Sequence, residues 1–167
     1  MFDKPYKIKG KHATYAKFLS ATTERLNRDA KVAGVFRYIV DIYLVAPLIG
    51  VAYNLKSDED TKTDDDVTIF AEAIINQQEN LTHVFRLVML AESNSKLNDD
   101  EKIQRAFKDD ENSLKVLENM ELFHQYMRGG IEWLFKQFTE DATTREDYLA
   151  KMTEIVDTYK QDFYFEI

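Results

Sequence analysis

The apolar segment at residues 32–55 (VAGVFRYIVDIYLVAPLIGVAYNL) constrains the fold of this chain more than any other feature. Its second half, residues 42–53, contains no charged residue and is apolar on nearly every face of a helix. A helix of this kind has to be surrounded by other elements, because none of its faces is suited to water. The segment is therefore predicted to form the central helix of an all-α domain.

Pro47 interrupts this segment. Proline lacks the N–H group that would bond to the carbonyl of Tyr43, and its ring crowds that carbonyl, so a kink or break is expected near Ala46. The uncharged run of twelve residues is too short to cross a bilayer, which takes about 20 residues. No membrane association is predicted.

The length and composition of the chain favour one helical domain. A chain of 167 residues, 44% of them hydrophobic, can bury a substantial core. Two prolines and five glycines favour helices over a sandwich or barrel. We expect an irregular bundle of about five to six helices around the kinked central helix. Residues 13–167 would form this domain, and residues 1–12 a basic extended arm.

Two absences limit the chemistry and the compartment that the sequence allows, the first bearing on chemistry and the second on compartment. The chain has no cysteine, which excludes disulfides and thiolate metal sites. No apolar stretch typical of a secretory signal follows the N-terminus. A cytoplasmic protein is therefore predicted.

Charge is distributed unevenly along the chain. Residues 1–31 carry eight Lys or Arg against three Asp or Glu, whereas the remainder carries fourteen against twenty-seven. Opposite signs predict that the arm docks on an acidic surface, either of its own body or of a partner. Tyr6 and Ile8 alternate with Lys7 and Lys9, so one side of an extended arm can pack while the other stays solvated.

Periodicity places the other helices. They are predicted over residues 13–26, 67–92 and 99–107, then over a long stretch containing Gly129-Gly130, and finally after a cap at Thr143 or Thr144. The glycine pair is expected to bend its helix or to let another backbone approach closely. Residues 57–66, which have no apolar anchor, are predicted to form an exposed, mobile loop. The long helix has a buried seam with a 3-4 spacing, made of Leu117, Met120, His124, Met127, Ile131, Leu134 and Phe138.

In residues 67–92, one buried face is predicted from the helical spacing of Phe70, Ile74, Leu81, Phe85 and Val88. Three polar residues of the same stretch are candidates for burial. Gln77 or Gln78 falls on or beside the apolar face predicted for residues 67–92, either as a buried amide that bonds a neighbouring helix or as the polar floor of a pocket. Arg86 lies in an apolar run and is expected to form an ion pair with a neighbouring helix.

His124 is a fourth buried polar candidate. Glu121 and His124 have the Glu-x-x-His spacing of carboxylate-bridged di-metal bundles. Such a site needs a second Glu-x-x-His, and the nearest counterpart, Glu79 with His83, is spaced four residues apart. A histidine packed in the seam is therefore predicted, with no metal and no cofactor. A metal or small-ligand site at Glu121, His124 and Gln78 is the alternative.

No motif for catalysis is found. The sequence has neither a nucleophile elbow nor a glycine-rich phosphate loop, so enzymatic activity is not predicted. We predict a non-catalytic protein-interaction module or accessory subunit of a cytoplasmic bacterial or phage assembly, with a protein partner or self-association. The alternatives are nucleic-acid association through the basic arm and an acidic decoy of a nucleic-acid-binding partner. The residues predicted to contact a partner are Lys4, Tyr6, Lys7, Lys9, Lys11, Phe163, Tyr164 and Phe165.

Overall fold

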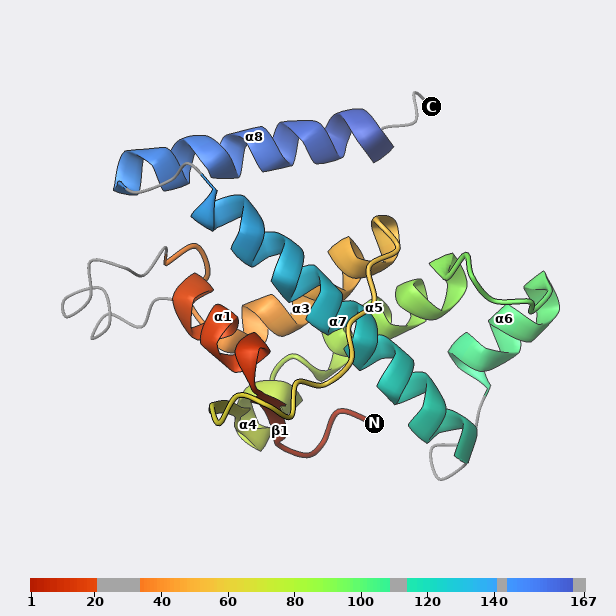
Figure 1. Ribbon diagram of the computed structural model, residues 1–167. Helices are drawn as coiled ribbons and strands as arrows, with labels where there is room; N and C mark the ends of the chain where they lie inside the picture. The colour runs from red at the N-terminus through yellow and green to blue at the C-terminus, as the bar shows by residue number, and fades with distance from the viewer. Residues whose placement is uncertain (21–33, 109–113, 141–143, 164–167) are drawn as a thin grey trace.

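The computed structural model describes residues 1–20, 34–108, 114–140 and 144–163 (Figure 1). The prediction of a predominantly helical chain is confirmed: these residues contain seven helices. They also contain one antiparallel two-stranded sheet, which was not predicted. In chain order the elements are β1 (Tyr6–Lys9), α1 (Lys11–Leu19), α3 (Ile39–Ala52), β2 (Asp66–Ile69), α4 (Ala71–Ile75), α5 (Gln78–Ala91), α6 (Asp99–Phe107), α7 (Leu114–Thr139) and α8 (Arg145–Phe163).

Helix α3 forms from the apolar segment and packs against α1, α5 and α7. It begins at Ile39, later than predicted, where the Tyr38 N–H donates to the Asp41 carboxylate at 2.9 Å. Residues 34–38 are not helical, and residues 32–33 lie outside the described part of the chain. Pro47 lies inside the helix, so the break considered near Ala46 does not occur.

Helices α3 and α7 touch through their backbones. A Cβ atom on Gly130 would lie 1.9 Å from the Ala46 carbonyl oxygen, and one on Gly50 would lie 2.0 Å from the Tyr126 carbonyl oxygen. Only glycine leaves room for such a crossing. Helix α7 continues through Gly129 and Gly130. Close approach of a second backbone, one of the two roles predicted for the glycine pair, is therefore confirmed.

The predicted arm forms the first strand of the sheet. Tyr6 lies opposite Ile69 and Lys9 opposite Asp66. Ile8 and Ile69 are buried and Tyr6 is half-buried, whereas Lys7 and Lys9 are exposed. The predicted alternation of a packed and a solvated side is confirmed, although the last residues of the arm, from Lys11, already belong to α1.

The prediction of one helix over residues 67–92 is wrong. This stretch forms β2, the short helix α4 and then α5. The β-branched run Val67-Thr68-Ile69 suits a strand, and β1 is available to pair with it. Asn76 and Gln77 separate α4 from α5. Phe70, which was predicted to be buried, is 73% exposed because it lies between the strand and α4.

The seam of α7 is buried from Met127 to Phe138, and His124 and Met120 are half-buried. Leu117, the first predicted seam residue, is 64% exposed because this end of α7 extends past the helices that cover its middle (Figure 1).

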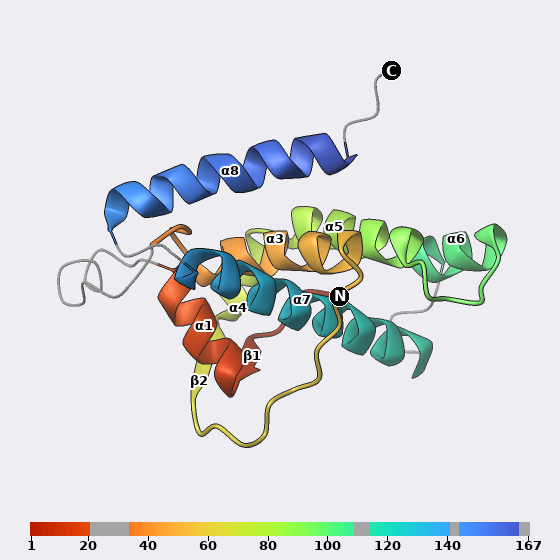
Figure 2. The same ribbon diagram turned by 45° about the horizontal axis from the view of Figure 1, so that its top comes forward.

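Caps set the starts of the two other C-terminal helices. Asn98 and Glu101 form the predicted capping box of α6. Helix α8 lies on the outside of the molecule (Figure 2), and Thr144 caps it through reciprocal bonds with Asp147. Thr143, the other predicted cap, lies outside the described residues. None of the helices in the described ranges combines the length and hydropathy required to span a bilayer.

Candidate functional site

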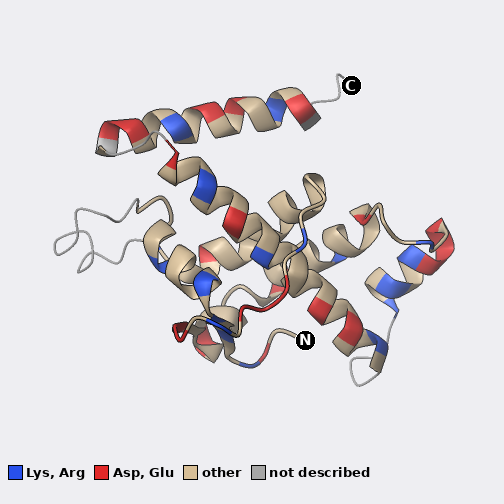
Figure 3. Ribbon diagram, in the orientation of Figure 1, with Lys and Arg blue, Asp and Glu red and all other residues tan. Residues whose placement is uncertain are grey.

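Three of the four lysines of the arm pair with acidic residues of the same chain. Figure 3 marks the basic positions in blue and the acidic positions in red along the ribbon. Lys7 contacts Asp66 at 3.1 Å, Lys9 contacts Glu59 at 2.6 Å, and Lys11 contacts Glu132 at 3.0 Å. Lys4 is exposed and forms no ion pair with a described residue. Of the two docking surfaces considered for the arm, its own body is therefore the one that it occupies.

Residues 57–66 are held by polar contacts, which corrects the expectation that nothing anchors them. The Asp60 carboxylate accepts the backbone N–H of Lys11 at 2.8 Å and so caps the start of α1. Backbone hydrogen bonds from Lys11 and Lys62 hold the pKa of Asp60 well below its ordinary value. Arg128 Nε donates to the Ser57 carbonyl at 2.8 Å. Most of these residues are nevertheless exposed, as predicted.

His12, Ser57 and Glu132 form a polar cluster whose geometry differs from that of a catalytic triad. His12 Nε2 lies 3.2 Å from Ser57 Oγ and 2.8 Å from Glu132 Oε1. A triad needs the acid on one ring nitrogen and the nucleophile on the other. Here both share Nε2, and Nδ1 is buried without a partner. Burial lowers the pKa of His12, although Glu132 opposes this shift. The cluster fastens the arm to α7.

His124 packs in an aromatic stack beside this cluster. Its ring lies 4.1 Å from the Tyr6 ring, and its Nε2 lies 2.8 Å from Tyr43 Oη. Burial, together with the positive charge of Arg128, lowers the pKa of His124 to about 3. Burial also raises the pKa of Tyr6 to about 12. His124 thus lies on the predicted seam, where it is half-buried.

Glu121 faces a different partner from His124. Its Oε1 accepts a hydrogen bond from Arg128 Nη2 at 2.5 Å. Within the described ranges, no group of three or more acidic or histidine side chains is arranged to hold a metal ion. The Glu-x-x-His spacing therefore serves two separate contacts in this structure.

The three other polar candidates are half-buried and have local partners. Gln78 Nε2 donates to the Met1 carbonyl at 3.0 Å, and Gln77 Oε1 accepts from Asn80 at 2.8 Å. The Arg86 guanidinium lies over the Phe107 ring, 4.9 Å from its centre. The ion pair expected for Arg86 is not found among the described residues, because α6 presents this aromatic ring to it.

The remaining predicted contact residues lie at the end of α8. Phe163 is the last residue of that helix. Tyr164 and Phe165 lie outside the described part of the chain. Their role in partner contact stays a prediction.

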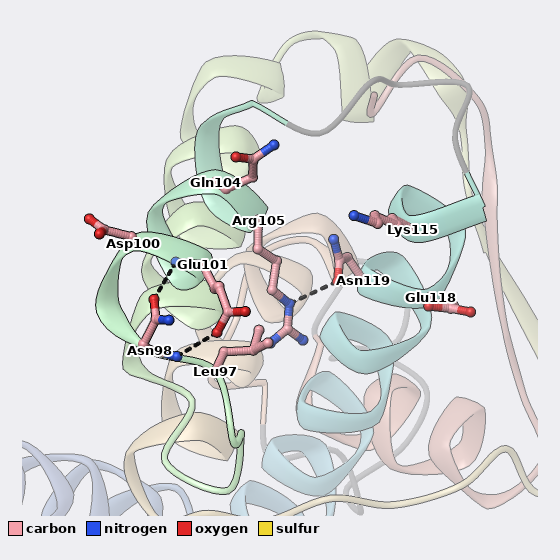
Figure 4. Close-up of a pocket in the computed structure, with 9 residues that line it drawn as sticks. All are labelled: Leu97, Asn98, Asp100, Glu101, Gln104, Arg105, Lys115, Glu118 and Asn119. Carbon is pink, nitrogen blue, oxygen red and sulfur yellow. Dashed lines mark hydrogen bonds between the residues drawn. The ribbon is translucent and has the colours of Figure 1, made fainter.

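A polar cleft of about 700 Å³ lies between α6 and α7 (Figure 4). Asn98 and Glu101 are engaged in the cap of α6. Arg105 donates to Asn119 at 2.8 Å and to the buried Glu92 at 3.0 Å. The polar groups deepest in this cleft are thus satisfied by the protein itself, and its charges are of mixed sign. These features do not define a ligand.

A second cavity, the apolar groove, has a volume of about 400 Å³. It is lined by Ser20, Arg37, Tyr38, Ile39, Val40, Thr68, Ile69, Phe70, Ala73, Asn76 and Gln77. Both aromatic side chains in this lining are largely exposed, Phe70 at 73% and Tyr38 at 51%. Exposed apolar surface of this kind, concentrated around a hollow, is typical of sites where proteins bind one another.

The groove also presents two unpaired polar groups. Ser20 is 1% exposed, and its Oγ has no hydrogen-bond partner among the described residues. The Arg37 guanidinium lies 5.1 Å from the centre of the Tyr38 ring and pairs with no carboxylate of the described chain. A buried hydroxyl without a partner is costly and uncommon.

Sequence reasoning missed this groove. Of its lining residues, only Gln77 was considered as part of a possible pocket. The β-branched run at residues 67–69 was the available signal, because a strand there would have placed Phe70 outside a helix seam.

No protein family, curated protein or solved structure matches the chain. A function therefore has to come from the geometry of the described sites. The fold and the groove define a predominantly helical protein with an exposed apolar groove.

Proposed function

We propose that the protein is a non-catalytic protein-interaction module, an accessory subunit that binds a partner protein through the apolar groove. The observation that carries this proposal is the exposure of Phe70 and Tyr38 around a hollow lined by apolar side chains. Aromatic residues are enriched at the centres of protein interfaces. Covering a side chain such as Phe70 contributes about 1.5–3 kcal/mol to binding.

The ion pairs of the arm favour this function over nucleic-acid binding. Affinity for nucleic acid depends on lysines that replace counterions along the phosphate backbone. Lys7, Lys9 and Lys11 already face carboxylates of their own chain, and the net charge of the chain is −8. The same contacts also count against the acidic decoy, because they cover part of the acidic surface with which a decoy would bind a nucleic-acid-binding protein.

Site-specific cross-linking tests this function. A photoreactive phenylalanine analogue is placed at position 70 and, as a matched control, at position 117, which is also exposed and apolar but lies outside the groove. We expect a protein from the native host to cross-link at position 70 and not at position 117.

The captured protein is then purified and titrated against three forms of the chain by calorimetry. Phe70→Asp should weaken binding at least tenfold, because it places a charge where an apolar contact forms. Leu117→Asp should bind as the wild type does. Equal affinity of all three forms would refute the groove as the binding site.

A further inference from the structure

The outer edge of β2 has free backbone groups. The Gly10 N–H donates to the Asp65 carbonyl at 2.7 Å, next to the Lys9–Asp66 pair of the ladder. Hydrogen-bonded pairs alternate along an antiparallel ladder, so Val67 and Ile69 point their N–H and C=O groups toward β1. Thr68 therefore points its N–H and C=O away from β1. No backbone group of the described residues bonds to Thr68 from that side.

This free edge borders the apolar groove. Thr68 and Ile69 are among the residues that line it. A sheet edge beside apolar pockets is the arrangement that proteins use to bind an extended segment as an added strand. The backbone bonds supply affinity, and alternate side chains of the segment enter the pockets.

The size of the groove favours a short segment over a second folded copy. Eleven residues line it, whereas a stable interface between folded proteins takes about 20–30 residues a side. Its charge also points to an acidic ligand, because Arg37 has no carboxylate partner within the described chain. A second copy of this chain, with its net charge of −8, would be repelled by the first copy as a whole. A short acidic segment can instead place a single carboxylate beside Arg37.

We propose that the partner contributes a short extended segment that adds as a third strand to the edge of β2 at Thr68, with apolar side chains in the groove and an Asp or Glu on Arg37. This inference rests on the proposed function.

Two variants at one position test the strand addition. Thr68→Pro removes the outward N–H, and proline is tolerated on an edge strand where that group faces away from the ladder. Thr68→Ala loses the same side chain but keeps the N–H. The ratio of their affinities therefore reports the backbone bond alone.

The probe is a phage-displayed library of random twelve-residue peptides, from which enriched sequences are synthesised and titrated by fluorescence anisotropy. Enriched peptides should alternate apolar and polar residues and carry an acidic residue. They should bind T68P at least tenfold more weakly than T68A. Arg37→Gln should weaken binding and reduce its dependence on salt.

Amide hydrogen exchange followed by NMR gives an independent readout in the wild-type protein. The Thr68 amide should become protected when a peptide binds. This measurement remains decisive if T68P does not fold.

Several results would overturn the proposal: no enriched peptide, equal affinity for T68P and T68A, or an unprotected Thr68 amide. Cross-links from the groove to residues 21–33 of the same chain would also overturn it. Loss of binding in Phe70→Asp without any difference between T68P and T68A would refute the added strand and leave the groove as the binding site. Unchanged binding in all of these variants would refute both.

Discussion

The neutral state of His124 predicts a specific loss of stability in mild acid. Its pKa is about 3 in the folded protein, against 6.5 for the free side chain. Between these values the unfolded chain binds a proton that the folded chain excludes, so stability is complete above pH 6.5 and falls as the pH is lowered. Each pH unit within this window is worth about 1.4 kcal/mol.

From pH 7 to pH 5 the loss attributable to His124 is about 2 kcal/mol. His12, whose pKa is also lowered, adds a loss of the same sign. The carboxyls with lowered pKa values, such as Glu92 and Glu132, start from an ordinary value of 4.5 and contribute mainly below pH 5. The interval from pH 7 to pH 5 therefore reports chiefly on the histidines.

Urea unfolding followed by circular dichroism at pH 7, 6 and 5 measures this loss. His124→Gln does not titrate and retains an acceptor for the Tyr43 hydroxyl, so the wild type should lose about 2 kcal/mol more than this variant between pH 7 and pH 5. His83→Gln is the control, because His83 is exposed on α5 and this substitution should leave the loss as in the wild type. A wild-type protein of constant stability across this interval would refute the reasoning. So would a His124→Gln variant that loses as much as the wild type.

Three further predictions concern the helix crossing and the arm. Gly130→Ala should lower the free energy of unfolding by about 3 kcal/mol or more in urea titrations, because the new methyl group meets the Ala46 carbonyl at 1.9 Å. Lys136→Ala, on the exposed face of α7, should change it by less than about 0.5 kcal/mol. Phe2→Ala should cost about 3–5 kcal/mol in the same assay, since Phe2 is 6% exposed in an aromatic cluster. Duplex DNA should not bind at physiological salt in fluorescence anisotropy, and sub-micromolar affinity would contradict the neutralised arm.

The sequence predicted the features that depend on the local pattern of apolar residues and on the sign of the charge in each part of the chain. The uniform apolarity of the segment around Ile42 required burial, and α3 is packed by three other helices. The spacing around Ile131 identified the buried side of α7. The opposite charges of arm and body required attraction, and the ion pair of Lys9 with Glu59 is one result.

The features that were missed depend on contacts between distant residues. Residues 67–92 were assigned to one helix because Phe70 and Ile74 match a helical period. The first residues of this stretch form a strand because they pair with β1, a contact that the local pattern does not reveal. The groove joins Ser20, Arg37 and Thr68, which come from three separate parts of the chain. No periodicity indicates that such residues meet.

The pairing of β1 with β2 also fixes an order of events during synthesis. β1 leaves the ribosome before the strand and the helices that cover its apolar side. At about 5–20 residues per second, the delay between Ile8 and the end of α7 is on the order of ten seconds. Throughout this delay Lys7 and Lys9 flank Ile8, and charges in that position discourage the pairing of one nascent strand with another. Uncharged residues at these two positions would therefore reduce the yield of folded protein more than its final stability.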